Sequence, residues 1–239
     1  MRCYLLILAL FPLLTSAGAA QEKTKFSHAD SLRGANSPQR NWWDVTFYDL
    51  HVSISPSDST IKGYNTIAYR VIRPSTEMQI DLQLPLVVDS MLQGGKSLAY
   101  TRDSNAFFVT VPSAPKGSTE NVSVYYHGRP RVASRPPWDG GFGWGVDSLG
   151  RTYFSTTDEG LGASVWWPTK DIPSDEPDSQ RIVITVPDPS IDVSNGRLRH
   201  TVKNADGTTT FEWFVTNAIN NYDVAATGDA MAVRRVQSA

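Results

Sequence analysis

The side chains best suited to chemistry gather in one stretch of the sequence, residues 154–179. Asp158 and Glu159 lie there side by side, with one glycine directly after them and another two positions later. Glycine lets the backbone turn beside a carboxylate, and the prolines that follow forbid regular helix or internal sheet pairing. The stretch is therefore predicted to be an irregular loop that presents carboxylates. The alternative interpretation is a plain crossover between two sheets, with Trp166 and Trp167 in the core.

Two acidic groups in this stretch suggest different chemistry. Asp158 and Glu159 form a pair of the kind that glycoside hydrolases use, but those enzymes need two carboxylates that face each other across a sugar. Clustering in the sequence does not establish that arrangement. The second group, residues 171–178, offers oxygen ligands of the kind that Ca²⁺ prefers. It lacks the spacing of an EF-hand loop, and a solvated acidic loop is the simpler interpretation.

The histidines do not have the spacing of a helical zinc site. They are His28, His51, His127 and His200, and no two of them lie four residues apart as the HExxH motif requires. The sequence also lacks the GxSxG elbow of serine hydrolases and the GxxxxGK[ST] phosphate loop. We therefore expect this chain to carry no metal ligands, no cofactor and no catalytic residues of its own.

Composition narrows the class of protein further. The chain has 239 residues, 40% of them hydrophobic, which is enough for one large β domain or two small ones. Its net charge of −2 gives no reason to expect nucleic acid or an anionic membrane surface as a partner. Seven tryptophans and nine tyrosines are typical of β-sandwiches and of carbohydrate or peptide binders.

The first twenty residues predict an export signal. Arg2 supplies a positive charge, residues 4–14 are apolar but too short to span a bilayer, and residues 17–19 form a small-x-small cleavage site. The one cysteine, Cys3, lies inside this segment, so the processed chain has no thiolate ligand and no disulfide. Since no second long apolar run follows, we expect an exported chain without a membrane span: periplasmic, cell-surface or extracellular.

Most of the remaining chain alternates apolar and polar residues in short runs. Residues 45–54 and 61–72 are the clearest strands, with one break in the alternation at Tyr48 that predicts a β-bulge. Turn residues recur every eight to twelve positions or so, which predicts an all-β fold, a sandwich or saddle of mostly antiparallel strands. Residues 129–150 are rich in glycine, proline and tryptophan, and we expect a long functional or covered loop there.

We divide the chain into four parts. These are a signal segment (1–20), an unstructured polar leader (21–40), one β domain (41–229) and an unpatterned tail (230–239).

Three segments of the β domain can be compared with a known family. The opening reads DVTFYDLHVSISPSDSTIKGYNTIAYRV (44–71), the middle EGLGASVWWPTKDIPSDEPDS (159–179) and the end NAINNYDVAATGD (217–229). In this order they resemble the N-terminal domain of the aminopeptidase N family of zinc metallopeptidases, and the specific middle run is close to that of secreted bacterial members. The resemblance covers residues 43–229. It implies a β-sandwich or saddle that packs on a separate thermolysin-like domain, which carries the zinc ligands, the general-base glutamate and the GAMEN substrate loop.

The HExxH and GAMEN motifs of that catalytic domain are absent from this sequence. The resemblance therefore implies the substrate-cleft domain of a secreted zinc aminopeptidase, a fragment that is inactive alone. Its partners would be the catalytic domain and peptide substrates, and zinc belongs to the complete enzyme. After Asp229 the chain departs from the family pattern and reads AMAVRRVQSA. Our hypothesis is a truncated or frameshifted reading frame, which sequencing of the downstream DNA for an HExxH-encoding frame would test.

The resemblance also carries over one functional position. The family has a Q-x-[QE] segment whose last side chain holds the α-ammonium group of the substrate. Counted back from Pro168 and Asp171, that position falls on Glu159, and the first falls on Thr157, where the family usually has glutamine. Gly160 frees the backbone beside this pair. A carboxylate that faces a cation forms a charge-assisted hydrogen bond and would restrict cleavage to peptides with a free amine.

A second interpretation needs no catalytic partner. The chain would then be a stand-alone exported β-sandwich module that binds glycans or peptides through Trp138, Trp144 and the loop of residues 129–150. Glu159 would in that case be an ordinary exposed glutamate.

Overall fold

The computed structural model describes residues 26–229, and strands dominate that part of the chain. The all-β prediction is confirmed. The strands are β1 (Trp43–Ser55), β2 (Thr60–Val71), β3 (Glu77–Asp81), β4 (Val87–Gln93), β5 (Lys96–Ser97), β6 (Tyr100–Asp103), β7 (Ala106–Thr110), β8 (Thr119–Gly128), β9 (Gly141–Val146), β10 (Thr152–Thr157), β11 (Ser179–Pro187), β12 (Ile191–Ser194), β13 (Arg197–Lys203), β14 (Thr208–Val215) and β15 (Ala226–Asp229). The helical elements are α1 (His28–Gly34) and the short 3₁₀ turns η1 (Ala163–Val165) and η2 (Asn221–Asp223).

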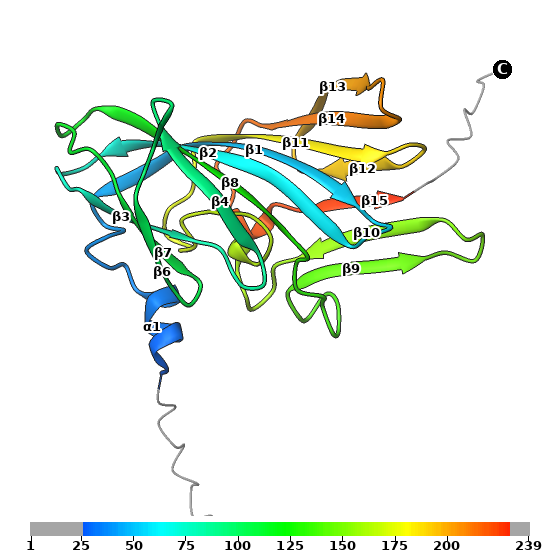
Figure 1. Ribbon diagram of the computed structural model, residues 1–239, viewed down its shortest axis with the longest axis horizontal. Coiled ribbons are helices and arrows are strands. Elements are labelled where there is room, and N and C mark those ends of the chain that lie inside the picture. Colours follow the sequence, from blue (N-terminus) through cyan, green and yellow to red (C-terminus); the bar gives the residue numbers. More distant parts are fainter. Residues whose placement is uncertain (1–25, 230–239) are drawn as a thin grey trace, which may run out of the picture.

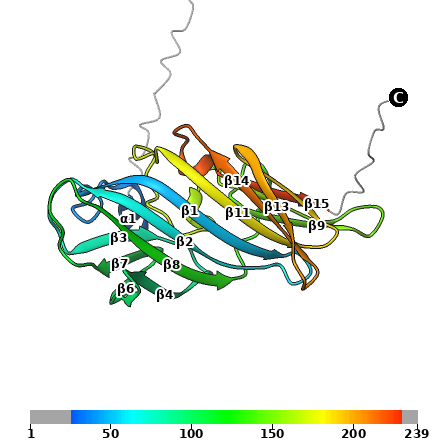
Figure 2. The same cartoon turned by 90° about the horizontal axis from the view of Figure 1, so that it is seen from above.

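The strands form three sheets in two layers. The large sheet has the order β13-β14-β11-β1-β2-β8-β4-β5, and all its pairs are antiparallel except β1 with β11. A four-stranded sheet, β12-β15-β10-β9, and a three-stranded sheet, β3-β7-β6, both lie on the same side of it, toward its two ends (Figure 1). Seen from above, the strands of the large sheet run diagonally across the domain, in front of parts of both smaller sheets (Figure 2). The arrangement is a saddle with its core between the layers.

Strand β1 follows the predicted alternation with one correction. The predicted bulge at Tyr48 is wrong in position, because the register of β1 against β2 shifts between Val45 and Phe47. Tyr48 is instead fully buried and in phase with Leu50. The extra residue turns Phe47 to the outer face, where its ring packs 6.1 Å from that of Phe214.

The glycine-rich loop of residues 129–150 contains a strand that the sequence pattern hid. Strand β9 pairs with β10 along its whole length. A Cβ on Gly145 would lie 2.2 Å from the Tyr153 ring, and one on Gly143 would lie 2.8 Å from Ser155 Oγ, so these two side chains occupy the space over that face of β9. Glycine here alternates with Phe142, Trp144 and Val146 rather than with polar residues, and the long loop expected at 129–150 is interrupted by this strand.

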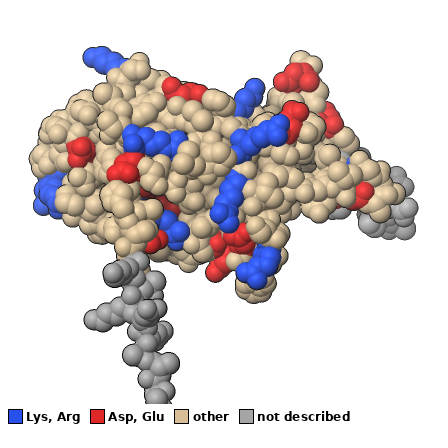
Figure 3. Space-filling model, turned by 60° about the horizontal axis from the view of Figure 1, so that its bottom comes forward, with Lys and Arg blue, Asp and Glu red and all other residues tan. Residues whose placement is uncertain are grey.

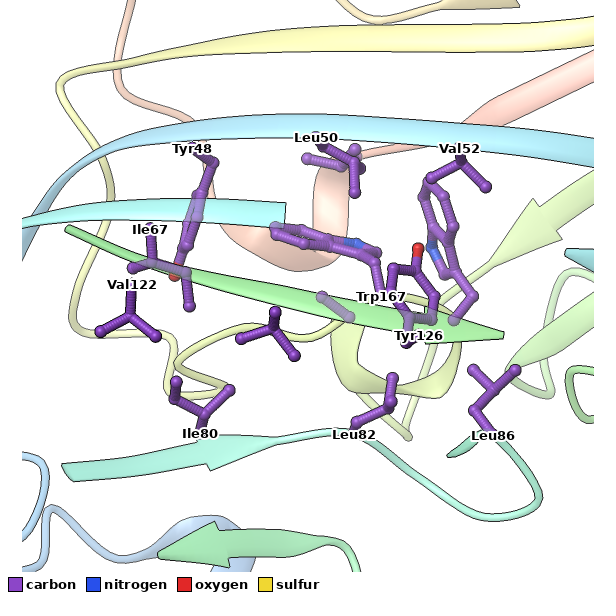
Figure 4. Packing of buried hydrophobic residues seen from close by; sticks show 14 of the residues in the cluster. Tyr48, Leu50, Val52, Ile67, Ile80, Leu82, Leu86, Val122, Tyr126 and Trp167 are labelled. Carbon is purple, nitrogen blue, oxygen red and sulfur yellow. The ribbon is translucent and has the colours of Figure 1, made fainter. Parts of the chain in front are cut away.

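The stretch after β10 runs through the middle of the domain, and we call residues 158–172 the central segment. All three residues of η1 are buried, and so are both tryptophans after it. In Figure 4, Trp167 lies between the β1 side chains above, including Leu50, and side chains of the lower layer, including Leu82. The backbone of Thr169 pairs with that of Asp81 in β3, which makes the central segment part of the lower layer. Both tryptophans are core residues, as the crossover interpretation required.

The leader is not unstructured throughout its described part. Ser27 caps α1 through a reciprocal capping box with Asp30. Arg40 is fully buried and forms an ion pair with Asp81. Residues 1–25 and 230–239, which hold the predicted signal segment, part of the leader and the tail, lie outside the described residues. No helix within residues 26–229 is long and apolar enough to cross a membrane.

Candidate functional site

A hollow of about 560 Å³ opens where the central segment begins, and we call it the carboxylate hollow. It brings together α1, the turn after β10, the end of the central segment and η2, which lie far apart in the sequence. Its lining includes Arg33, Asp158, Glu159, Gly160, Asp171 and Tyr222.

The turn that carries Glu159 is fixed by its own backbone. The amides of Leu161 and Gly162 both donate to the Asp158 carbonyl, at 3.2 and 2.9 Å. Gly160 lies inside this turn, between Glu159 and Leu161, with φ of +68°, a left-handed conformation that glycine adopts without strain. Glu159 is exposed at the apex, and its carboxylate makes no hydrogen bond or ion pair with the described residues. The turn therefore presents a free anion to the hollow.

The glycine-rich loop supports this turn from behind. Thr157 Oγ donates to the Asp139 carbonyl at 2.7 Å. A Cβ on Gly140 would lie 2.9 Å from Leu161 Cβ and 3.1 Å from the Glu159 carbonyl, so the two backbones are in close contact. Thr157 is thus tied to the loop and is not part of the hollow lining, whereas Glu159 and Gly160 are.

The other two carboxylates of the hollow, those of Asp158 and Asp171, are buried, whereas that of Glu159 is exposed to solvent. Asp158 accepts a hydrogen bond from Trp166 Nε1 at 3.4 Å, and its other oxygen is buried without a partner among the described residues. Burial raises the pKa of Asp158 well above its usual range, and the charges of Asp171 and Asp223 raise it further. Asp171 accepts from Ser164 Oγ at 2.5 Å, and burial is the main cause that raises its pKa too.

Arg33 is a lining residue that sequence reasoning missed, because the leader was expected to lack structure. Its Nη2 donates to the Gly160 carbonyl at 2.7 Å. The end of α1 is held by Arg40, whose Nη1 donates to the carbonyls of Arg33 and Ala35 at 2.8 and 2.9 Å. The capping box of Ser27 was the signal in the sequence that could have revealed this helix.

The second acidic group does not form a cation site. Asp175 forms an ion pair with Lys170, and it accepts from the Val45 amide at 3.2 Å. Within residues 26–229, no three histidine, cysteine or acidic side chains lie close enough together to hold a metal ion. The described residues therefore do not fit the zinc that the resemblance assigns to the complete enzyme.

The residues of the glycan-binding interpretation do not form a platform. The Trp144 ring stacks on that of Phe142 at 4.6 Å and packs against the core. Trp138 is 77% exposed. The structure thus uses one of the two tryptophans for packing. Positive and negative side chains are interspersed over the face shown in Figure 3, so local charges rather than one broad field would guide a ligand.

Solved structures with a similar fold are zinc metallopeptidases. A mutant M1 zinc metallopeptidase from Deinococcus radiodurans matches with a TM-score of 0.68 and 20% identity, over 82% of this chain and 44% of that one. A mutant of that enzyme bound to a Tyr-Ser-Ala substrate matches with a TM-score of 0.67 and 22% identity, with the same coverage. Native yeast LTA4 hydrolase matches with a TM-score of 0.61 and 17% identity, over 86% of this chain and 33% of that one.

The chain shares its fold with M1 zinc metallopeptidases. The resemblance found in the sequence is therefore confirmed at the level of the fold. The chain spans less than half the length of these structures. No family model and no curated protein matches it.

Proposed function

We propose that this chain is the substrate-cleft domain of an exported zinc aminopeptidase, and that Glu159 holds the α-ammonium group of the peptide. One observation supports this most: an exposed carboxylate without a partner among residues 26–229 lies on a hydrogen-bonded turn at the rim of a hollow, in a fold shared with M1 metallopeptidases. An anion that protein cations leave free is available to a cationic ligand.

The physical role of Glu159 would be to select and position. A charge-assisted hydrogen bond from the ammonium group to the carboxylate would hold the amine end of the peptide in one place. A peptide with a blocked amine would leave Glu159 without its cation and would bind less well. Because the first peptide bond lies two bonds from that nitrogen, holding the nitrogen also positions the bond to be cleaved.

Cleavage itself would come from a different part of the enzyme. The HExxH and GAMEN motifs are missing from the sequence, and the described residues offer no metal site. We therefore infer that a thermolysin-like catalytic domain, in the same polypeptide or a separate one, completes the cleft. The chain alone would bind peptides and not hydrolyse them.

Ligand titration followed by NMR tests the role of Glu159. We expect L-leucinamide, which has a free amine, to shift the amide resonances of Gly160 and Gly162 in a saturable manner. N-acetyl-L-leucinamide should bind at least tenfold more weakly, and Glu159→Gln should weaken binding of the free amine by a similar factor. Glu176→Gln removes an exposed glutamate that does not line the hollow, and it should leave binding unchanged.

Two outcomes would contradict the proposal. The first is equal binding of the acetylated and the free amine. The second is a Glu159→Gln variant that binds L-leucinamide as well as the wild type does.

A further inference from the structure

Four charged side chains are prominent in the carboxylate hollow, but only two of them are available to a ligand. Asp158 and Asp171 are both buried, at 6% and 7% exposed, and Asp171 Oδ2 accepts hydrogen bonds from the Ser164 hydroxyl and amide. Glu159 and Arg33 are both exposed. The hollow therefore presents one free anion and one cation to whatever enters it.

The Arg33 guanidinium has donors to spare. Within the described part of the chain its one hydrogen bond is from Nη2 to the Gly160 carbonyl, which leaves the other N–H groups free. A guanidinium binds a carboxylate with two parallel hydrogen bonds, in a geometry that a single ammonium cannot match. Its backbone is held in place by Arg40, which is itself buried against Asp81. Arg33 thus lies at a defined place beside Glu159.

We propose that Arg33 is a specificity-determining residue that receives a carboxylate on the first residue of the bound peptide. This inference rests on the proposed function, because it takes Glu159 as the site of the α-ammonium group. The ammonium group and the first side chain leave the same Cα, so a side chain must lie close to the residue that holds the amine. The hollow beside Glu159 then favours peptides that begin with aspartate or glutamate.

A basic first residue fits the same hollow poorly. Its side chain would meet the Arg33 guanidinium, and Asp158 and Asp171, which could offset this repulsion, are both buried. Burial also favours the neutral forms of Asp158 and Asp171, since it raises the pKa of both. The accessible charge of the hollow thus discriminates against lysine and arginine at the first position.

A carboxylate on the first residue has two possible sources, the side chain or the α-carboxylate of a free amino acid. Three ligands of nearly equal size separate these sources. L-isoglutamine has a free amine and a side-chain carboxylate, L-glutamine has a free amine and an α-carboxylate, and L-glutaminamide has a free amine and no carboxylate. N-acetyl-L-isoglutamine keeps the side-chain carboxylate and lacks the amine.

Titration of the chain with these ligands, followed through the Gly160 and Gly162 amides by NMR, tests the inference. We expect L-isoglutamine to bind about fivefold more tightly than L-glutaminamide, a size typical of a partly exposed charge pair. Arg33→Gln should abolish this ratio by weakening L-isoglutamine alone. Arg33→Lys, which keeps the charge and loses the planar fork, should retain part of it. Arg197→Gln, an exposed arginine on β13 outside the hollow, is the matched control and should retain all of it.

The outcomes separate this inference from the proposed function. Equal binding of L-isoglutamine and L-glutaminamide, or tighter binding of L-glutamine than of L-isoglutamine, overturns the role of Arg33 and leaves Glu159 as the amine site. An Arg33→Gln variant that weakens both ligands equally also overturns it, because Arg33 would then act only through the Gly160 turn. If N-acetyl-L-isoglutamine binds as well as L-isoglutamine while the Arg33 effect persists, the role of Glu159 fails and that of Arg33 stands. Absence of saturable shifts with every ligand overturns both roles.

Discussion

Two buried aspartates of this domain share their immediate chemistry and differ in their surroundings. Asp158 accepts a hydrogen bond from Trp166 Nε1 at 3.4 Å, and Asp192 accepts one from Trp213 Nε1 at 2.9 Å. In both, Oδ1 is buried without a partner in the described part of the chain. Burial is the largest cause that raises the pKa of each carboxyl. By local contacts alone, the two would be equal candidates for a functional group.

Their surroundings give them different roles. Asp158 lies in a turn at the rim of the carboxylate hollow, next to the exposed Glu159. Asp192 lies on β12 of the four-stranded sheet, and its side chain accepts the hydrogen bond from Trp213 of the large sheet. It does not line the hollow. A raised carboxyl pKa therefore reports burial in this domain. The exposed carboxylate that could bind a ligand is that of Glu159, the residue after Asp158.

The largest expected effect is on stability, and it differs between Trp166 and Trp213, the tryptophans that donate to these aspartates. Trp166 is fully buried in the central segment, whereas Trp213 is only partly buried against the core. We expect Trp166→Ala to lower the free energy of unfolding by about 4 kcal/mol, and Trp213→Ala by about half as much, because less apolar surface is lost. Urea unfolding measures both. Equal losses would contradict the view that the central segment is the core of the domain.

The next effect is the dependence of stability on pH through Asp192. Its pKa is raised to about 7 in the fold, so the protonated carboxyl is favoured there. This contribution to stability is complete below the unfolded pKa of about 4 and is lost as the pH rises through about 7. Asp192→Asn removes the titration. Relative to the wild type, we expect the free energy of unfolding of the variant to rise by about 4 kcal/mol between pH 4 and pH 8.

Urea unfolding of both proteins at pH 4, 6 and 8 measures this difference. Other acids of the domain titrate in the wild type and in the variant alike, so the difference isolates Asp192. A difference that stays constant over the three pH values would show that Asp192 is not protonated in the fold.

A smaller effect is expected from Asp158 on ligand binding. Because its free oxygen is sealed from solvent, Asp158→Asn should change the affinity for L-leucinamide by less than about twofold. Asp192→Asn serves as the matched control, since it removes a similarly buried carboxyl outside the hollow. A tenfold loss on Asp158→Asn alone would show that Asp158, and not Glu159, carries the binding.

The smallest effect is expected from Glu159 on stability. Glu159 is exposed and has no partner among the described residues, so Glu159→Gln should change the free energy of unfolding by no more than about 0.5 kcal/mol. Thermal unfolding without ligand measures this. A larger loss would mean that Glu159 is a structural residue, and its effect on binding would then need another explanation.

The sequence predicts the strands of the large sheet best. Residues 45–54 and 61–72 alternate because one face of each strand is buried and the other is not. Strand β9 does not show this alternation because the side chains of Tyr153 and Ser155 lie over the glycines on one of its faces. These side chains belong to the partner strand β10, so the sequence of β9 alone does not reveal them.

The candidate site could be predicted only in part. Glu159 and Gly160 are adjacent in the chain, so their turn is a local property that the sequence contains. Arg33 and Tyr222 reach the hollow through folding of distant segments, and no local pattern places them there. The hydrogen bond of Thr157 to the Asp139 carbonyl likewise depends on where the glycine-rich loop lies.

A crystal structure of the chain with L-leucinamide bound tests the central claim most directly. The account predicts that the ammonium nitrogen lies about 2.7–2.9 Å from a carboxylate oxygen of Glu159, the distance of a charge-assisted hydrogen bond. An ammonium group bound elsewhere would contradict it. The clearest such result would be a ligand in the hollow of about 590 Å³ beside Lys62 and His127.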